Sequence, residues 1–79
     1  MAINDLVLRG EYITLDALLK STGLASSGGA AKVLIADGAA RVNGDIETRR
    51  GRKLRAGDQV RVGDALIDIK PANTAQPTL

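Results

Sequence analysis

The most chemically distinctive stretch of this sequence places five cations within seven positions, namely Arg49, Arg50, Arg52, Lys53 and Arg55. Two neighbouring cations about 7 Å apart in water repel each other by roughly 0.6 kcal/mol before salt screening. Five of them therefore cost on the order of a few kcal/mol at most, in a domain whose stability is about 5–15 kcal/mol. A bound phosphate chain would remove this cost. On charge alone, a phosphate-binding loop and a well-solvated basic loop explain the stretch equally well.

Charge is unevenly distributed along the chain. The 79 residues carry a formal net charge of +2, and the pI is about 9.4. Residues 41–61 hold seven basic and three acidic side chains, a net charge of +4, whereas the rest of the chain carries −2. Such a dipolar surface steers an anionic partner toward the basic half.

The residue types that are absent exclude several functions. The chain has no Cys and no His, which excludes disulfides, thiol nucleophiles, the usual zinc sites and a histidine general base. No carboxylates form a recognisable catalytic pair, and Ser27 has no candidate base. No stretch approaches the roughly 20 apolar residues of a membrane helix, and the first residues do not resemble a signal peptide. We expect a cytoplasmic, monomeric protein that is not an enzyme and uses no cofactor, metal or membrane.

A first helix is predicted over about residues 15–21 from the spacing of its apolar residues. Its apolar face consists of Leu15, Leu18 and Leu19. Thr14 is predicted to be the N-cap and Gly23 to end the helix. Before this helix, the apolar run over residues 6–9 predicts a first strand.

A second helix is predicted from Ser26-Ser27 to about Asp37, with Gly38 as the C-terminal cap. Its apolar face consists of Ala31, Leu34 and Ile35. Gly28 and Gly29 are poor helix formers, each costing about 1 kcal/mol relative to Ala in a helix interior. Two explanations stay open, namely close packing of the two helices or bare backbone N–H groups that bind an anion.

After the second helix the apolar pattern alternates with a period of two, which predicts strands. Asn43-Gly44 predicts a hairpin between strands at residues 40–42 and 46–48. Two further strands are predicted at residues 59–62 and 65–69. The fold class is therefore α+β, with two short helices packed on a small, mostly antiparallel sheet.

The chain is expected to form one domain over residues 1–70. Residues 71–79 lack periodicity and are expected to form a disordered C-terminal tail.

This succession of elements resembles the S4-like RNA-binding domain, which is named after a protein of the small ribosomal subunit. The matching residues are Leu15, Asp16, Leu18, Leu19, Ser27, Ala31, Lys32, Leu34, Ile35, Gly38, Val42, Asn43, Gly44, Leu54, Gly57, Asp58 and Val60. Short, stand-alone bacterial members share Ser-Gly-x-x-Ala-Lys, here residues 27–32, and Glu-Thr-Arg-basic, here residues 47–50. The chain departs from many members at Gly28, where they carry Arg.

The resemblance implies an alpha-L RNA-binding motif that docks on structured RNA, ribosomal or transfer RNA, through the second helix and the basic loop. With Tyr12 as the single aromatic residue, the chain cannot offer the row of stacking platforms that single-strand readers use. Contacts to phosphates and 2′-hydroxyls are expected instead. The candidate RNA-binding residues are Ser27, Gly28, Lys32, Arg41, Arg49, Arg50, Arg52, Lys53 and Arg55.

Two other functions are weighed against RNA binding. A protein-interaction module would use the same basic loop to meet an acidic protein partner. A small sulfur carrier shares Val-Asn-Gly and Gly-Asp-x-Val, but such carriers end in Gly-Gly, whereas this sequence ends in Pro-Thr-Leu.

Overall fold

The computed structural model describes residues 2–71. The tail predicted over residues 71–79 therefore lies, apart from Pro71, outside the described residues. Within the described part, no helix is long and apolar enough to cross a membrane.

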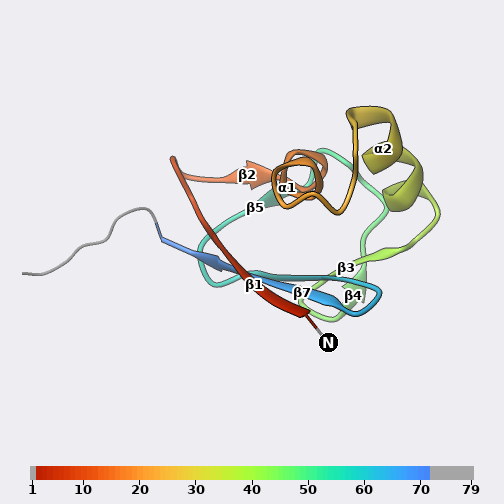
Figure 1. The fold of residues 1–79 in the computed structure, drawn as a ribbon. Helices are drawn as coiled ribbons and strands as arrows, with labels where there is room; N and C mark the ends of the chain where they lie inside the picture. The colour runs from red at the N-terminus through yellow and green to blue at the C-terminus, as the bar shows by residue number, and fades with distance from the viewer. Residues whose placement is uncertain (1, 72–79) are drawn as a thin grey trace, which may run out of the picture.

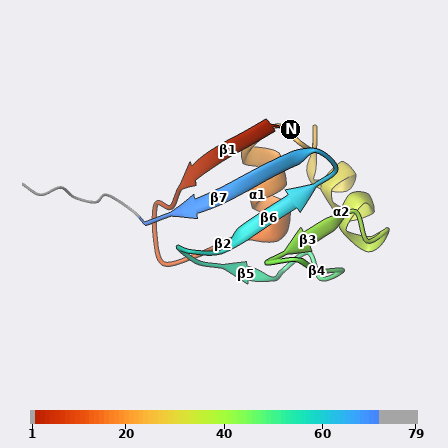
Figure 2. The same cartoon turned by 90° about the horizontal axis from the view of Figure 1, so that it is seen from below.

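Two helices lie on one face of a five-stranded sheet (Figure 1). The helices are α1 (Leu15–Ser21) and α2 (Gly28–Ala36). The strands are β1 (Ala2–Val7), β2 (Ile13–Thr14), β3 (Ala40–Val42), β4 (Asp45–Ile46), β5 (Lys53–Leu54), β6 (Gln59–Val62) and β7 (Ala65–Lys70). The main sheet has the order β1-β7-β6-β3-β4, visible in Figure 2, and β2 pairs with β5 in a second, two-stranded sheet. Because only β1 and β7 run parallel, the predicted α+β class with a mostly antiparallel sheet is confirmed.

The hydrophobic core lies between the helices and the main sheet. Its fully buried larger side chains are Leu15, Leu18, Leu19, Ile35, Leu54, Val60, Ile67 and Ile69. Each such side chain contributes about 1.5–3 kcal/mol through burial. The predicted apolar face of α1 is buried throughout, while in α2 Ala31 and Ile35 are buried and Leu34 packs half-buried against the core.

The first strand is longer and begins earlier than the sequence predicts. It was expected at residues 6–9, but β1 spans Ala2–Val7. It pairs with β7 in parallel register from Ala2 opposite Ala65 to Val7 opposite Lys70. Asn and Asp, which occupy positions 4 and 5, are depleted in strands, so pairing with a distant segment overrides local propensity here.

The start of α1 is stabilised differently from the prediction. Thr14 occupies the N-cap position, but its hydroxyl donates to Asp16 Oδ1 at 2.7 Å and caps no helix N–H. The backbone N–H of Leu15 donates to the carbonyl of Arg52 at 2.9 Å, and that of Asp16 to the carbonyl of Arg50 at 3.1 Å. Two N–H groups of the first turn, which have no partner within the helix, are thus satisfied by the basic stretch.

The predicted boundaries of α2 are confirmed. Ser27 is the N-cap, and its Oγ accepts a hydrogen bond from the Ala30 N–H at 3.1 Å. The helix ends before Gly38, which has a φ of +79° that favours glycine. A Cβ added at Gly28 would meet no atom within 4 Å, and one at Gly29 would meet only Ser27 Oγ at 3.9 Å. Close helix packing therefore does not explain the two glycines.

The Asn43-Gly44 turn is fixed by side-chain hydrogen bonds to a distant loop. Both residues have positive φ, +53° and +92°. Asn43 donates through Nδ2 to Asp58 Oδ1 at 3.1 Å, and its Oδ1 accepts from the Gln59 N–H at 2.9 Å. Asp58 Oδ2 also accepts from the Arg55 N–H at 2.8 Å, which is the main reason why the pKa of Asp58 is lowered. The Asn-Gly and Gly-Asp motifs therefore hold each other in place.

The return strand of this hairpin is shorter than predicted. It was expected over residues 46–48, but β4 contains only Asp45 and Ile46. The N–H of Glu47 still donates to the Ala40 carbonyl of β3 at 3.0 Å, while its carboxylate is bound by Arg49 and Arg52.

Replacing Asn43 tests this link. We expect Asn43→Ala to lower the free energy of unfolding by about 1–2 kcal/mol, because it removes two hydrogen bonds and places Ala, which tolerates positive φ less well than Asn, in this turn. Urea unfolding of Asn43→Gly as the matched control separates the two causes, since glycine relieves the backbone but does not restore the hydrogen bonds. Unchanged midpoints for both variants would contradict the bridge.

Candidate nucleic-acid interface

The five cations lie on a segment whose backbone is fixed at several points; residues 47–55 are called the basic segment below. Figure 1 shows it leaving the sheet at β4, rising beside the helices and returning through β5. The Arg52 N–H donates to the Arg49 carbonyl at 3.2 Å, which closes a tight turn. The carbonyls of Arg50 and Arg52 are bound by the first turn of α1. With the backbone engaged in this way, the cationic side chains project outward.

Glu47 is the acid around which the start of the segment is built. Glu47 is only 7% exposed to solvent. Arg49 donates to it through Nε at 3.0 Å, through Nη2 at 3.2 Å and through its backbone N–H at 3.1 Å. Arg52 donates through Nη1 at 2.8 Å. These bonds, those of the Arg49 side chain first and of Arg52 second, lower the pKa of Glu47 from 4.5 to about 2.

Arg49 and Arg52 keep hydrogen-bond donors for a second anion. A guanidinium has five N–H groups, and Arg49 uses Nε and Nη2 on Glu47, whereas Arg52 uses only Nη1. Their side chains are 75% and 35% exposed, respectively. An open depression of about 480 Å³ is lined by Arg49, Gly51, Arg52 and Lys53. The carboxylate thus orients two guanidinium groups beside a surface hollow and neutralises one of their two charges.

The other three cations of the segment are exposed and form no salt bridge within residues 2–71; they are Arg50, Lys53 and Arg55. Lys53 Nζ lies 5.0 Å from the centroid of the Tyr12 ring, and Arg55 Cζ lies 5.8 Å from it. With Glu47 as its single acid, the basic segment keeps a net charge of +4.

The remaining candidate residues are distributed over other elements. Ser27 serves as the cap of α2, Gly28 is its exposed first residue and Lys32 is exposed on the same helix. Arg41 is exposed between two buried residues of β3, so it points away from the helices. Its Nη1 donates to the Gly44 carbonyl at 3.3 Å, and its cross-strand neighbour is Arg61. Lys32 lies on α2, whereas Arg41 faces away from the helices, and the expected extension of the basic patch by these two residues stays a prediction.

Comparison with known proteins now gives the family. Residues 6–70 match the model of the S4 domain. The chain belongs to the S4 domain family. It is 39% identical over 59 residues to "Probable ribosome maturation protein RlbA" of Bacillus subtilis (strain 168), covering 75% of this chain and 83% of that protein. It is 43% identical over 49 residues to "Putative RNA-binding protein YbcJ" of Escherichia coli (strain K12), covering 62% of this chain and 70% of that protein.

Two residues important to the geometry of this S4 domain were missed as site residues. The sequence pattern placed Glu47 only in a motif, although an acid two and five positions before arginines is a signal for such an ion pair. Tyr12 stood out only as the single aromatic residue. Its proximity to Lys53 and Arg55 depends on the β2–β5 pairing, for which the local sequence pattern gives no signal.

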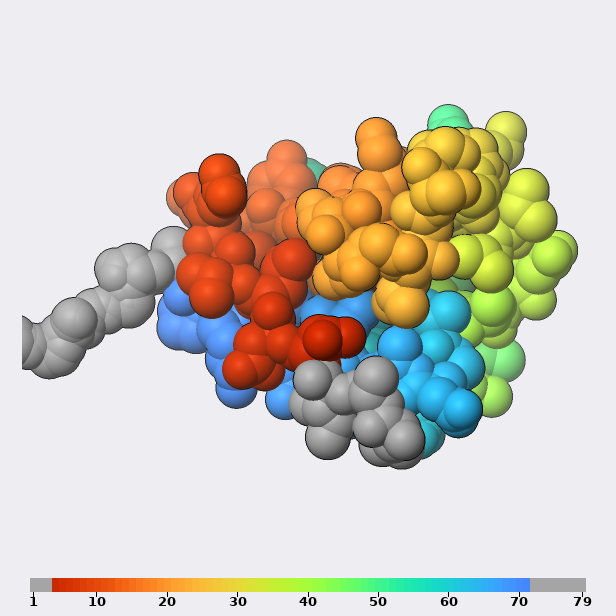
Figure 3. Space-filling view, viewed as in Figure 1, coloured from red at the N-terminus to blue at the C-terminus, as the bar shows by residue number. Residues whose placement is uncertain are grey.

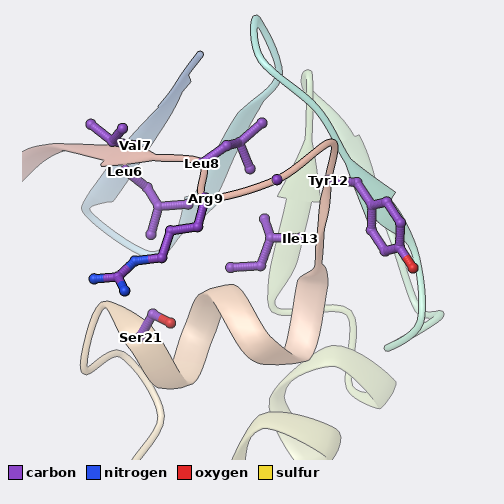
Figure 4. A pocket seen from close by; sticks show the side chains of 8 residues that line it. Leu6, Val7, Leu8, Arg9, Tyr12, Ile13 and Ser21 are labelled. Carbon is purple, nitrogen blue, oxygen red and sulfur yellow. The ribbon is translucent and has the colours of Figure 1, made fainter. Parts of the chain in front are cut away.

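A second hollow of this S4 domain is lined by none of the residues of the basic segment. It has a volume of about 520 Å³ and is lined by Leu6, Val7, Leu8, Arg9, Gly10, Tyr12, Ile13 and Ser21. Figure 3 shows the face of the molecule that carries β1, the residues after β1 and the two helices. In Figure 4, Arg9 extends across the groove toward Ser21 of α1, while Tyr12 points away from it. Among the described residues, no group of three or more acidic side chains could hold a metal ion.

Removing the charge of Glu47 tests its role in the segment. Because its pKa is lowered to about 2 in the folded chain, its contribution to stability is complete above about pH 4.5 and is lost as the pH falls toward 2. We expect Glu47→Gln to lower the free energy of unfolding at pH 7 by about 1–3 kcal/mol. The difference from the parent, measured by urea unfolding, should vanish near pH 2.

The control for this experiment is Asp45→Asn. Asp45 is exposed and forms no salt bridge within the described residues, so this variant should follow the parent at pH 7. A destabilisation of Glu47→Gln that stays constant from pH 7 to pH 2 would contradict a role of the ionised carboxylate.

Proposed function

We propose that this S4 domain binds structured RNA through its ribose-phosphate backbone and catalyses no reaction. The observation that carries the proposal is the basic segment. Its backbone is anchored to α1 and presents five cations, and the carboxylate of Glu47 orients two of them, Arg49 and Arg52. The names of the similar proteins, which refer to RNA binding and to ribosome maturation, support ribosomal RNA or an assembling ribosomal particle as the target. Transfer RNA is the next target to compare.

The geometry favours phosphate recognition for a physical reason. Arginine binds phosphate through a planar pair of N–H groups, and an arginine that is already oriented loses less conformational freedom on binding. Glu47 orients Arg49 and Arg52 in this way. Arg50, Lys53 and Arg55 add charge without a competing salt bridge in the described chain. Release of counterions from the RNA then supplies most of the binding free energy.

The chain is suited to structured RNA and not to unpaired bases. The ring of Tyr12, the one aromatic side chain, is flanked by two cations. Stacking on aromatic rings contributes about 1–3 kcal/mol per base in proteins that read single strands. Without further rings, shape and phosphate spacing must select the target.

Helix α2 extends the proposed interface at its N-terminus. Gly28 leaves the helix start bare, and Lys32 follows about one turn later on the exposed side. Arg41 faces the other side of the sheet, so it reaches the same RNA only if the RNA passes around the β3–β4 edge.

Neutralising the three cations of the basic segment that form no salt bridge with residues 2–71 tests the proposal. We expect Arg50→Gln/Lys53→Gln/Arg55→Gln to weaken binding to a folded ribosomal RNA fragment. The slope of log affinity against log salt should fall by about 0.7–0.9 for each phosphate that the variant no longer binds. Fluorescence anisotropy over a salt series measures both quantities. Arg49 and Arg52 are left unchanged because replacing them would also leave the carboxylate of Glu47 without its ion-pair partners.

The matched control is Arg9→Gln/Lys20→Gln/Lys70→Gln, which removes the same charge from other elements and should bind nearly as tightly as the parent. Equal losses of affinity for the two triple variants would show that net charge alone matters and would reject the assigned interface. A parent that binds neither ribosomal nor transfer RNA in a salt-dependent way would reject the function and favour an acidic protein partner.

Gly28 offers a gain-of-function test. A side chain at this position meets no atom within 4 Å, so Gly28→Arg should fold and place a cation at the start of α2. We expect tighter RNA binding and a salt slope that is steeper by about 0.7–0.9. Ala36→Arg adds the same charge at the exposed far end of the helix, about 12 Å away at ~1.5 Å per residue, and serves as the control. Equal effects of the two variants would exclude a specific role for the helix start.

A further inference from the structure

The two-stranded sheet of β2 and β5 has one buried and one exposed side. Ile13 is paired with Leu54, which is fully buried, and Ile13 itself packs against the core. Side chains alternate along a strand, so the neighbouring residues project to the other side. The pairs are Ile13 with Leu54 and Thr14 with Lys53, and extending this antiparallel register by one residue places Tyr12 opposite Arg55, with Lys53 as the diagonal neighbour.

On this exposed side, two cations lie against one aromatic ring. Lys53 Nζ is 5.0 Å and Arg55 Cζ is 5.8 Å from the centroid of Tyr12, both within the range of about 6 Å for cation–π attraction. Tyr12 is 44% exposed, and Lys53 and Arg55 are exposed as well. Figure 4 shows the Tyr12 ring beside the strand and turned away from Leu8 and Ile13.

The ring offsets the repulsion between the two cations. Lys53 begins β5 and Arg55 directly follows it, so the two side chains, two residues apart, project to the same side, repel each other and would otherwise occupy many rotamers. The negative face of an aromatic ring attracts both and limits their rotamers, while the sides of the cations that face solvent stay free. This arrangement holds two positive charges within about 6 Å of one ring centroid.

We propose that Tyr12 is a positioning residue of the RNA interface, which holds Lys53 and Arg55 together on the exposed side of β2 and β5 for contact with phosphates. The inference rests on the proposed function and adds the aromatic residue and this sheet face to the interface. Tyr12 acts through the two cations and makes no stacking contact with a base.

Two substitutions separate the ring from the other properties of Tyr12. Tyr12→Phe keeps the ring and removes the hydroxyl, so it should bind a folded ribosomal RNA fragment within about twofold of the parent. Tyr12→Leu keeps apolar bulk without a ring and should bind about two- to fivefold more weakly, the size expected for exposed cation–π interactions. Tyr12→Ile, which favours a strand, is a second variant without a ring.

The double-mutant cycle distinguishes positioning from direct binding of the RNA. In the Lys53→Gln/Arg55→Gln background, Tyr12→Leu should cause no further decrease in affinity, because the groups through which it acts are gone. An undiminished decrease in that background would mean that Tyr12 touches the RNA itself or acts through the fold, and would overturn the inference. So would equal binding by parent and Tyr12→Leu, or equal decreases for Tyr12→Phe and Tyr12→Leu.

A measurement on the free protein separates this inference from the function on which it rests. Proton NMR should show ring-current shifts of the Lys53 side-chain methylene groups in the parent and in Tyr12→Phe, and none in Tyr12→Leu. Missing shifts in the parent would overturn the positioning role. Shifts without salt-dependent RNA binding by the parent would reject the proposed function, and with it the role of Tyr12 in the interface.

Discussion

The basic surface of this S4 domain depends on one nearly buried carboxylate, that of Glu47. It accepts hydrogen bonds from two guanidinium groups and one backbone N–H, while the backbone N–H of Glu47 donates to the Ala40 carbonyl at 3.0 Å. A buried charge is costly without partners, so the acid requires Arg49 and Arg52 as much as they are oriented by it. Glu47 thereby joins the sheet to the basic segment through both its backbone and its side chain.

The backbone of the basic segment is also held in place by hydrogen bonds to other parts of the fold. Its carbonyls satisfy the first N–H groups of α1, and at its end the Arg55 N–H is bound by Asp58, which Asn43 holds in turn. Each of these arrangements joins the segment to another part of the fold. A loop with five cations can stay ordered in this small domain because its backbone groups form part of the fold.

The cations of the chain therefore fall into different structural groups. Arg49 and Arg52 are oriented by an acid, Lys53 and Arg55 lie against an aromatic ring, and Arg50 is exposed without a salt bridge in the described chain. Two further arginines, at positions 41 and 61, are neighbours on the sheet face away from the helices. Counting charges along the sequence combines all of these into one patch, whereas the fold divides them between two faces.

Local features were well determined by the sequence alone. The positions of the helix ends, of the Asn43-Gly44 turn and of the buried face of α1 were predictable from residues within about four positions of one another. The hydrogen bonds that stabilise the start of α1 and the turn come from distant segments. The S4-like resemblance likewise rests on these local motifs and is confirmed by the family match over residues 6–70.

Only the tertiary structure decided which distant segments meet. Such contacts between distant segments create the parallel pairing of β1 with β7 and the β2–β5 pair. They also bring the Arg50 and Arg52 carbonyls to the start of α1 and decide on which side of the sheet Arg41 lies. Hydrogen bonds and ion pairs between these segments form when the core packs, and the residues involved carry no local pattern that names their partners. The sequence therefore determined that the chain is basic and which elements it forms, while the packing of the core decided where each charge is placed.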